Sequence, residues 1–342
     1  MTDATISKRY RSRYPRQGRI AVLCEGDLAG FEADLLEKWT ADTQYVDVWP
    51  CGTKTAIYGV SDAIGRAVPM VVIEDRDFRN TDAARKDCKR KAEDRRKREV
   101  KVVEWLPWQR HEIENYLIEP DVLVPVLEKV FGSSEATIDS RLGSVLENMH
   151  VEQAALATRA DFAAMLPDKY EGKFGVGLPP AARPSWDSEQ ARLTFPDTEL
   201  VECELKKALD EAAYQSTDEG KKVNVQQCMD TFERYRADWR DMKAEAETWR
   251  VQWAGKEVLT NIVKWLAGEF GWPSGPGENR KPVEWDKLNR AGAGAQERLI
   301  MQYLQPQLVT SLIEFLEDAE NEHAIRQEWR QLRTIIANSH DA

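Results

Sequence analysis

Acidic side chains follow two apolar, strand-like segments in the first third of the chain. Glu25 comes directly after one of them, and Asp75 and Asp77 follow the other. Because side chains alternate along an extended chain, Asp75 and Asp77 face one side while Glu74 and Arg76 face the other. Carboxylates held close together repel one another, and a divalent cation offsets that repulsion. Oxygen ligands favour Mg²⁺ or Mn²⁺ over Zn²⁺, so the pattern predicts a Mg²⁺ or Mn²⁺ site if the two segments are neighbouring strands.

Four short runs rich in apolar or β-branched residues have the length of β-strands. They span Arg19–Cys24, Tyr45–Trp49, Met70–Glu74 and Val100–Trp105. Stretches of helical character separate them, at Leu28–Thr40, Lys54–Ala67 and Asn80–Arg98. Strands that alternate with helices predict βαβ units and therefore a parallel sheet flanked by helices. The loops after such strands lie at one edge of the sheet, where ligands bind, so we expect Glu25, Asp75 and Asp77 to meet there.

Beyond about Pro120 the apolar residues adopt the spacing that is typical of α-helices. The helical segments are Asp121–Phe131, Val151–Leu166, Leu200–Ala213, a long stretch near Val223–Phe270, and Gly294–Ala337 with a break around Pro306. The predicted fold class is α/β, with an N-terminal parallel sheet flanked by helices and a mainly α-helical C-terminal region. We divide the chain into a basic N-terminal extension (1–18), an α/β domain (19–120) and a helical region for partner binding or oligomerisation (121–342).

Length and composition fit a protein of about two domains. A chain of 342 residues is too long for one compact core, and 42% hydrophobic with 31% charged residues suits a globular protein. No apolar run reaches the roughly 20 residues of a membrane-spanning helix, and the polar N-terminus lacks a signal-peptide core. Five cysteines without a Cys-x-x-Cys pair argue against a disulfide framework and a zinc site. The sequence therefore predicts a cytoplasmic protein with no membrane contact.

Charge is distributed unevenly along the chain. Residues 1–110 hold 22 Lys and Arg against 18 Asp and Glu, although the net charge of the whole chain is −11. The segment Arg79–Lys101 carries eleven basic residues against five acidic ones. Such a helix can bind the phosphate backbone of a nucleic acid; the alternative is a solvated helix that pairs with the acidic C-terminal half. The candidate nucleic-acid-binding residues are Lys54, Arg85, Lys89, Arg95, Arg96 and Arg98.

Two of the polar residues near the expected edge have both a functional and a structural interpretation. Lys54, after the second strand-like run, either reaches a phosphate from the same edge or simply begins a helix. The string Gly52–Thr55 lacks the spacing of a P-loop, so we assign no nucleotide hydrolysis to this chain. His111, beside Glu112 and Glu114, either joins the site or acts as a structural hydrogen-bonding group, which is the commoner role of a lone histidine.

The acidic motifs resemble those of a known family. Glu25-Gly26 after the first strand and Asp75-Arg-Asp77 after the third are similar to the signature of the TOPRIM fold, which topoisomerases, bacterial primases and OLD-type nucleases share. Together with Trp108–Leu117, the aspartate motif resembles more narrowly the stand-alone TOPRIM proteins of bacterial anti-phage systems. In systems of the PARIS type such a subunit, AriB, works beside an ABC-type ATPase, AriA. The resemblance covers roughly residues 19–120, with a weaker similarity at Gly255–Leu259.

The resemblance implies a metal-dependent nuclease that cleaves DNA or RNA, tRNA included, as the toxic effector of an anti-phage system controlled by an ABC-type ATPase. It implies Glu25 as metal ligand or general acid/base, Asp75 and Asp77 as metal-binding aspartates, and Glu114 as a further acidic ligand. The implied cofactor is Mg²⁺ or Mn²⁺, with one or two ions. Many OLD-type proteins carry a second acid about four residues after the glutamate, where this chain has Ala29. The acids available to replace it are Asp27, Glu32 and Asp34.

A second hypothesis is a catalytically inactive TOPRIM-like subunit that regulates a partner or binds nucleic acid. The presence of Glu25, Asp75 and Asp77 together argues against it. A receiver-like signalling domain fits poorly, because its pocket needs paired acids after the first strand and a lysine after the last. Under the nuclease hypothesis, the acidic helical region contacts either the ATPase or a second copy of the chain in a homodimer.

Overall fold

The computed structural model describes residues 18–26, 30–43, 45–76, 78, 81–165, 178–187, 189–190, 192–215, 224–240, 247–270, 293–318 and 323–339. These residues belong to two compact units. The first unit combines Met1–Tyr116 with Val309–Ala342, and the second comprises Leu117–Leu308. The sequence predicted that the α/β domain ends at residue 120. The first unit does end near there, but it also contains the C-terminal residues of the chain.

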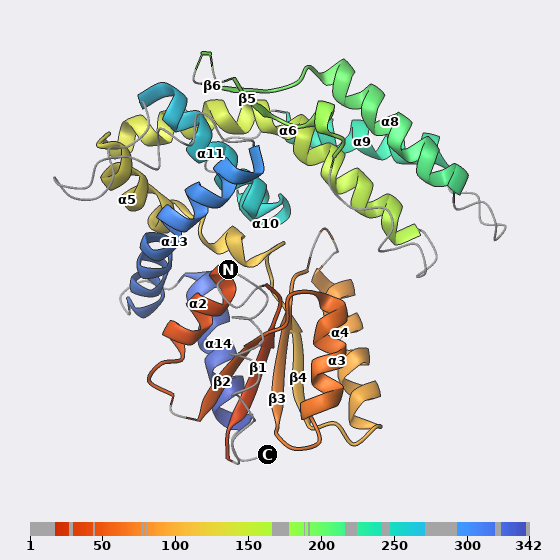
Figure 1. The fold of residues 1–342 in the computed structure, drawn as a ribbon, viewed down its shortest axis with the longest axis vertical. Helices are drawn as coiled ribbons and strands as arrows, with labels where there is room; N and C mark the ends of the chain where they lie inside the picture. Colours follow the sequence, from red (N-terminus) through yellow and green to blue (C-terminus); the bar gives the residue numbers. More distant parts are fainter. Residues whose placement is uncertain are drawn as a thin grey trace. The chain divides into compact units, whose positions relative to one another are not determined.

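A four-stranded parallel sheet forms the centre of the first unit (Figure 1). Its strands are β1 (Ile20–Cys24), β2 (Val46–Pro50), β3 (Met70–Glu74) and β4 (Val102–Pro107), in the order β2-β1-β3-β4. The central strands β1 and β3 are buried along their whole length, which explains why both read as nearly continuous apolar runs. Since β1 pairs with β3, the strands that precede the acidic motifs are neighbours, and the predicted fold class is confirmed.

Helices cover both faces of this sheet (Figure 1). The helices α3 (Lys54–Ile64) and α4 (Thr81–Arg96) lie on one face. The helix α2 (Phe31–Trp39) and the C-terminal helix α14 (Ala324–Asn338) lie on the other. The buried residues of α14 recur every three or four positions, as expected for a helix with one apolar face. Along the chain, the residues of the second unit therefore come after the strands of the sheet and before α14, one of the helices that cover it.

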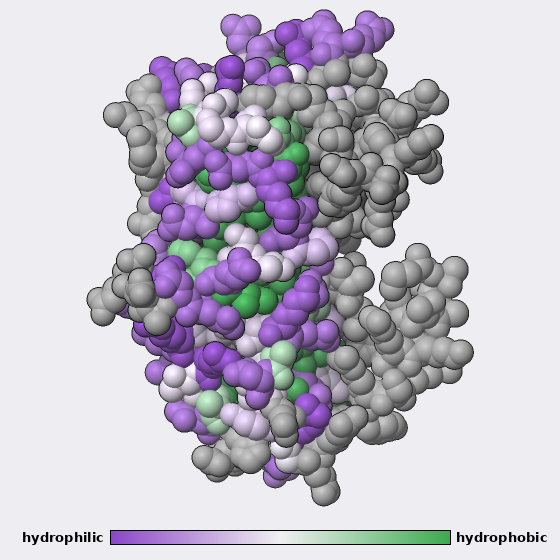
Figure 2. Space-filling view, turned by 90° about the vertical axis from the view of Figure 1, so that its left-hand side faces the viewer, coloured by the Kyte–Doolittle hydropathy of each residue, from purple (hydrophilic) through white to green (hydrophobic). Residues whose placement is uncertain are grey.

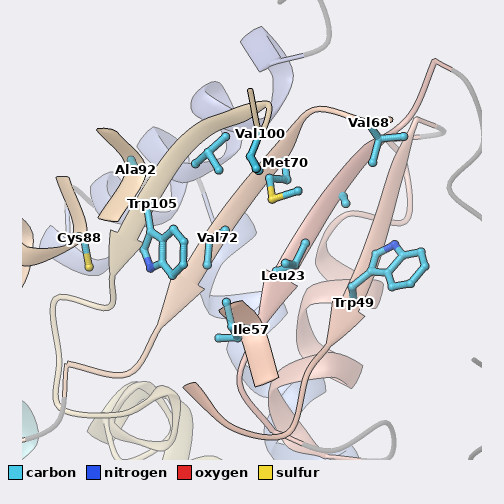
Figure 3. Packing of buried hydrophobic residues seen from close by; sticks show 12 residues of the cluster. Leu23, Trp49, Ile57, Val68, Met70, Val72, Cys88, Ala92, Val100 and Trp105 are labelled. Atoms are coloured by element: carbon cyan, nitrogen blue, oxygen red, sulfur yellow. The ribbon is translucent and has the colours of Figure 1, made fainter. Parts of the chain in front are cut away.

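A hydrophobic core lies between the sheet and the helices α3 and α4 (Figure 3). Leu23 of β1, Val72 of β3 and Trp105 of β4 point to this face. Ile57 of α3 and Ala92 of α4 pack against them, and all five side chains are almost fully buried. Burial of each large apolar side chain stabilises the folded state by roughly 1.5 to 3 kcal/mol. This core fixes the strands whose ends carry the acidic residues.

The second unit is mainly helical, as predicted. Its elements are α5 (Pro120–Phe131), α6 (Glu135–Met165), η2 (Pro180–Ala182), β5 (Ser185–Asp187), β6 (Arg192–Thr194), α8 (Thr198–Gln215), α9 (Val225–Trp239), α10 (Glu247–Gln252) and α11 (Gly255–Phe270). The helix α13 (Ala293–Glu317) crosses the boundary between the units in sequence and continues through Pro306, where we expected a break. The side chains of Leu304 and Leu308 on either side are buried, and this burial offsets the backbone hydrogen bond that proline cannot make.

The described surface carries few large apolar side chains. Those that are exposed are Met165, Leu200 and Tyr214. Hydrophilic residues alternate with smaller hydrophobic areas on the face shown in Figure 2. Across the described ranges, no helix combines the length and the apolar character needed to cross a bilayer.

A buried glutamate lies between two helices of the second unit. Glu152 of α6 accepts a hydrogen bond from the side-chain amide of Asn261 on α11, over 3.0 Å. Burial, with the nearby negative charge of Glu257, raises the pKa of Glu152 to about 8, although the positive charges of Lys264 and Arg183 oppose the shift. The folded protein therefore keeps a proton on this carboxyl at neutral pH.

We expect this proton to make the second unit less stable as the pH rises. In the unfolded chain Glu152 loses its proton near its ordinary pKa of 4.5, whereas in the folded chain it keeps the proton to about pH 8. Stability should therefore fall between these two values, by on the order of 2 to 5 kcal/mol. Urea unfolding at several pH values measures the slope. The Glu152→Gln variant should show a flatter profile, and an unchanged slope would rule this residue out as its source.

Candidate acidic site

Glu25 and Asp75 meet at the carboxyl edge of the sheet. A carboxylate oxygen of Glu25 accepts a hydrogen bond from the backbone N–H of Asp75 over 2.9 Å. The ammonium group of Lys54, at the start of α3, lies 3.9 Å from the same oxygen. Glu74 instead faces α4 and binds Lys91, as the alternation of side chains along β3 requires. The structure thus brings together three of the residues that the sequence singled out: Glu25, Asp75 and Lys54.

Two glycines tie the loops after β1 and β2 together at this edge. Gly26 and Gly52 both have φ of 87°, which favours glycine because a β-carbon would be strained there. The N–H of Gly52 donates to the carbonyl of Gly26 over 2.8 Å. The next residue, Thr53, caps α3 by accepting a hydrogen bond from the N–H of Ala56. This local geometry places Lys54 beside the end of β1.

A third carboxylate reaches the site from α2. Glu32 lies in the first turn of that helix, where the helix dipole favours negative charge. Its side chain is buried and accepts a hydrogen bond from the indole N–H of Trp108 over 2.9 Å. A β-carbon on Gly26 would lie 3.7 Å from a carboxylate oxygen of Glu32, so this side chain packs against the turn after β1. Asp34, another of the candidate acids, is bound to Lys38 instead.

Burial and mutual repulsion make negative charge costly at this edge. Burial, followed by the charges of Glu32 and Glu25, raises the pKa of Asp75 well above its ordinary value. Burial also raises the pKa of Glu32, although the hydrogen bond from Trp108 opposes the shift. Burial and the nearby negative charges therefore both disfavour ionisation of these two carboxyl groups. A bound cation would offset this cost, and the donors are all oxygen atoms, which suits Mg²⁺ or Mn²⁺.

The cysteines near the site are poor nucleophiles. Burial, with the nearby charge of Glu32, raises the pKa of Cys24 well above its ordinary value. The same causes raise the pKa of Cys51 to about 12. Because the thiolate is the reactive form of cysteine, both side chains are inert near neutral pH. The chemistry available here therefore depends on the carboxylates and on Lys54.

The segment after β4 adds further acidic groups. Glu114 lies on the short helix η1 (Ile113–Tyr116), and the charges of Glu112 and Glu114 both contribute to the raised pKa of Asp75. His111 is buried against the ring of Phe78, with 4.1 Å between ring centres, and its Nδ1 lies 3.4 Å from the Glu112 carboxylate. The negative charge of Glu114 is therefore close enough to raise the pKa of Asp75 at this edge.

Asp77 and Asp27 lie outside the described residues, so the structure does not place them. Within the ranges that are described, no three Asp, Glu, His or Cys side chains are arranged to hold a metal ion. A complete ligand set that includes Asp77 stays a prediction. Glu25, Asp75 and Glu32 bring carboxyl oxygen atoms to this edge, but these three alone do not form such a set.

The basic residues of α4 divide into two groups by position. Since α4 follows β3, it starts at the carboxyl edge of the sheet and runs back toward the opposite edge. Arg85 is exposed in its first half, and Lys89 is exposed just past its midpoint. Arg95 is buried at its end, bound to Asp62 over 2.7 Å, and Arg96 donates to the carbonyl of Val102. At 1.5 Å of rise per residue, Arg95 lies roughly 15 Å further along the helix than Arg85.

Arg98 lies beyond the end of α4 and is exposed. Of the six candidate nucleic-acid-binding residues, Lys54 therefore lies at the acidic edge. Arg85 and Lys89 lie closer to this edge along α4 than Arg95, Arg96 and Arg98 do. The contacts of Arg95 and Arg96 favour the structural interpretation for these two, because their guanidinium groups bind the protein itself.

No protein-family model matches this sequence, and a search of curated proteins finds no significant match.

Proposed function

We propose that this chain is a divalent-metal-dependent nuclease of the TOPRIM type, which hydrolyses phosphodiester bonds. The observation that carries the proposal is the meeting of Glu25 with Asp75 at the carboxyl ends of neighbouring parallel strands. Glu32 adds a buried carboxylate, and burial, followed by the negative charges of Glu32 and Glu25, raises the pKa of Asp75. Such an arrangement has little value as packing, since buried carboxylates are costly, but it suits a cation site.

In this proposal Glu25, Asp75 and Asp77 hold Mg²⁺ or Mn²⁺, with Glu114 as a further acidic ligand. The ion would polarise a phosphoryl oxygen and lower the pKa of bound water. In the reaction, the water would lose a proton as its oxygen bonds to phosphorus, and the bridging P–O bond would break as the leaving oxygen takes up a proton. Lys54, 3.9 Å from Glu25, would attract a non-bridging phosphate oxygen and so orient the phosphodiester.

The exposed face of α4 would bind the phosphate backbone near the acidic edge. We expect the double variant Arg85→Gln, Lys89→Gln to weaken binding of a short nucleic-acid duplex. Each lost phosphate contact should lower the slope of log affinity against log salt by about 1, and therefore by about 2 in the double variant. Fluorescence anisotropy at several salt concentrations measures this slope.

Arg98→Gln is the matched control for this experiment. It removes one exposed positive charge, half as many as the double variant, from the turn at the opposite edge of the sheet. We expect a smaller loss of binding free energy per charge removed from this variant. Equal losses per charge in the two proteins would show that only the net charge matters, and the assignment of α4 as the binding face would then be abandoned.

We further propose that the nuclease is the toxic effector of an anti-phage system and is controlled by an ABC-type ATPase. This step rests on the resemblance of the acidic motifs and of Trp108–Leu117. The helical second unit would then contact the ATPase or a second copy of the chain. Mass analysis of the purified protein, alone and mixed with such an ATPase, tests both forms of association.

The purified protein should cleave DNA, messenger RNA or tRNA when Mg²⁺ or Mn²⁺ is added, and EDTA should stop the reaction. An assay with all three nucleic acids, with and without the ATPase, identifies the substrate. Absence of cleavage under every one of these conditions would favour the alternative, a catalytically inactive TOPRIM-like subunit that regulates a partner or binds nucleic acid.

A further inference from the structure

Four buried aromatic rings connect the C-terminal helix to the rest of the first unit. Trp329 of α14 contacts Trp39 of α2, Trp108 after β4 and Tyr116 of η1, with ring centres 4.9, 5.2 and 5.6 Å apart. The Trp108 ring is stacked on Trp329, and the other two meet it edge-on. We call these four residues the aromatic cluster. Aromatic pairs of this kind stabilise the fold by more than the burial of their apolar area alone would. The cluster therefore holds three separate segments in place.

Trp108 links the aromatic cluster to the acidic site. Its backbone N–H donates to the carbonyl of Glu74 at the end of β3, over 3.0 Å. Its indole N–H donates to the carboxylate of Glu32, over 2.9 Å. Trp108 is only 2% exposed, so water is poorly placed to replace the indole as donor. One side chain thus joins the end of β3, the first turn of α2 and the C-terminal helix.

Glu328, the residue before Trp329, fixes the same segment by hydrogen bonds. Its carboxylate accepts from the backbone N–H of Gln109, over 3.1 Å, and from the hydroxyl of Tyr116. Gln109 follows Trp108 directly, and Tyr116 belongs to the aromatic cluster. Two consecutive residues of α14 therefore hold the segment after β4, one by ring packing and one by hydrogen bonds.

We infer that α14 is a positioning element of the acidic site: Trp329 and Glu328 fix Trp108, whose indole N–H holds the Glu32 carboxylate near Glu25 and Asp75. The consequence for metal binding rests on the proposed function. Removal of the indole N–H would leave the buried Glu32 carboxylate without this donor. An unsatisfied buried acceptor is costly, which favours a different orientation of the Glu32 side chain. Partners that orient the acidic groups of a metal site typically change metal affinity or activity about 10- to 100-fold when removed.

The variant Trp108→Phe tests the inference, with Trp49→Phe as its control. Trp108→Phe keeps an aromatic ring but removes the donor to Glu32. Trp49 is also buried in the sheet of the first unit, and its indole N–H has no hydrogen-bond partner among the described residues. Isothermal titration of Mn²⁺ into the full-length protein should show affinity about 10- to 100-fold weaker for Trp108→Phe and a change below about threefold for Trp49→Phe. Equal affinities in the two variants would overturn the inference.

A second measurement tests the role of α14 without metal or activity. In the metal-free protein, hydrogen exchange of the Trp108 indole N–H can be followed by NMR. We expect Trp329→Leu to speed this exchange about tenfold or more, because the ring that covers Trp108 is lost. An unchanged exchange rate in a folded Trp329→Leu protein would refute the positioning role, even if Trp108→Phe proved too unstable to study.

The two measurements separate the inference from the proposed function. If the wild-type protein neither binds Mn²⁺ nor cleaves nucleic acid, the proposed nuclease fails, and the exchange experiment alone decides whether α14 positions Trp108. If the wild-type protein binds Mn²⁺ and Trp108→Phe binds it equally well, the nuclease stands and the positioning role falls.

Discussion

Glu25→Gln and Asp75→Asn should each lower nuclease turnover by about 10³-fold or more. Each variant removes a charged oxygen ligand, and a contribution of about 4 kcal/mol to the transition state corresponds to that factor. Both substitutions keep the size of the side chain. Gln at position 25 also keeps a carbonyl oxygen that can accept the hydrogen bond from the N–H of Asp75. Initial rates of cleavage under saturating Mg²⁺ measure the effect.

The stability of the same variants distinguishes a functional role from a structural one. Burial, followed by repulsion from Glu32 and Glu25, raises the pKa of Asp75, so removal of one acidic group should leave the metal-free protein as stable as before or more so. Glu93→Gln, an exposed glutamate of α4, serves as the control with unchanged activity. If Glu25→Gln and Asp75→Asn kept full activity but unfolded more easily, the two carboxylates would be structural groups.

Lys91→Met should destabilise the first unit by about 3 to 5 kcal/mol, because it leaves a buried carboxylate without its cation. Glu74 is 1% exposed, and its carboxylate accepts hydrogen bonds from Lys91 over 2.8 Å and from the indole of Trp105 over 3.0 Å. Although burial opposes it, the negative charge of Glu74 raises the pKa of Lys91 above its ordinary value. The free energy of unfolding in urea measures the loss.

Lys89→Met provides a matched control on the same helix. Lys89 is exposed two residues away, and a surface substitution of this kind usually changes stability by less than about 0.5 kcal/mol. The double variant Lys91→Met, Glu74→Gln should recover part of the lost stability, since it removes the charge that Lys91 compensates. A Lys91→Met protein as stable as Lys89→Met would contradict this explanation.

The sheet and the meeting of its acidic ends could be predicted because the signals are local and physical. Buried parallel strands read as short apolar runs, and the helices between them fix their direction. A carboxylate that directly follows such a strand must lie at the ligand-binding edge. Glu25 and Asp75 could therefore be paired across fifty residues without knowledge of any side-chain position.

The place of α14 could not be predicted in the same way. Its sequence shows an amphipathic helix, but nothing local indicates that its buried face packs on a sheet formed by the first 107 residues. Twelve tryptophans in the chain leave too many pairings to identify the contact of Trp329 with Trp108. Long-range packing of this kind depends on the complete fold, so no local pattern links the C-terminal residues to the first unit.

The basic residues that follow β3 show that the roles of single residues could not be predicted either. Lys89, Lys91 and Arg95 look alike in sequence, yet Lys89 faces solvent, Lys91 binds Glu74 and Arg95 binds Asp62. Likewise, Asp27, Glu32 and Asp34 all follow Glu25 closely in sequence, and only burial against Trp108 distinguishes Glu32 from Asp34. Charge identifies candidates, whereas burial and partners decide their roles.

The most direct test of the nuclease proposal is a crystal structure of the protein grown with Mn²⁺, in which anomalous scattering locates the ion. We predict an ion bound by carboxylate oxygens of Glu25 and Asp75 at the carboxyl edge of the sheet, with Asp77 beside them. The proposal would be contradicted if no ion were bound at this edge under saturating Mn²⁺ and the Glu25 carboxylate kept its contacts with Lys54 and the Asp75 backbone.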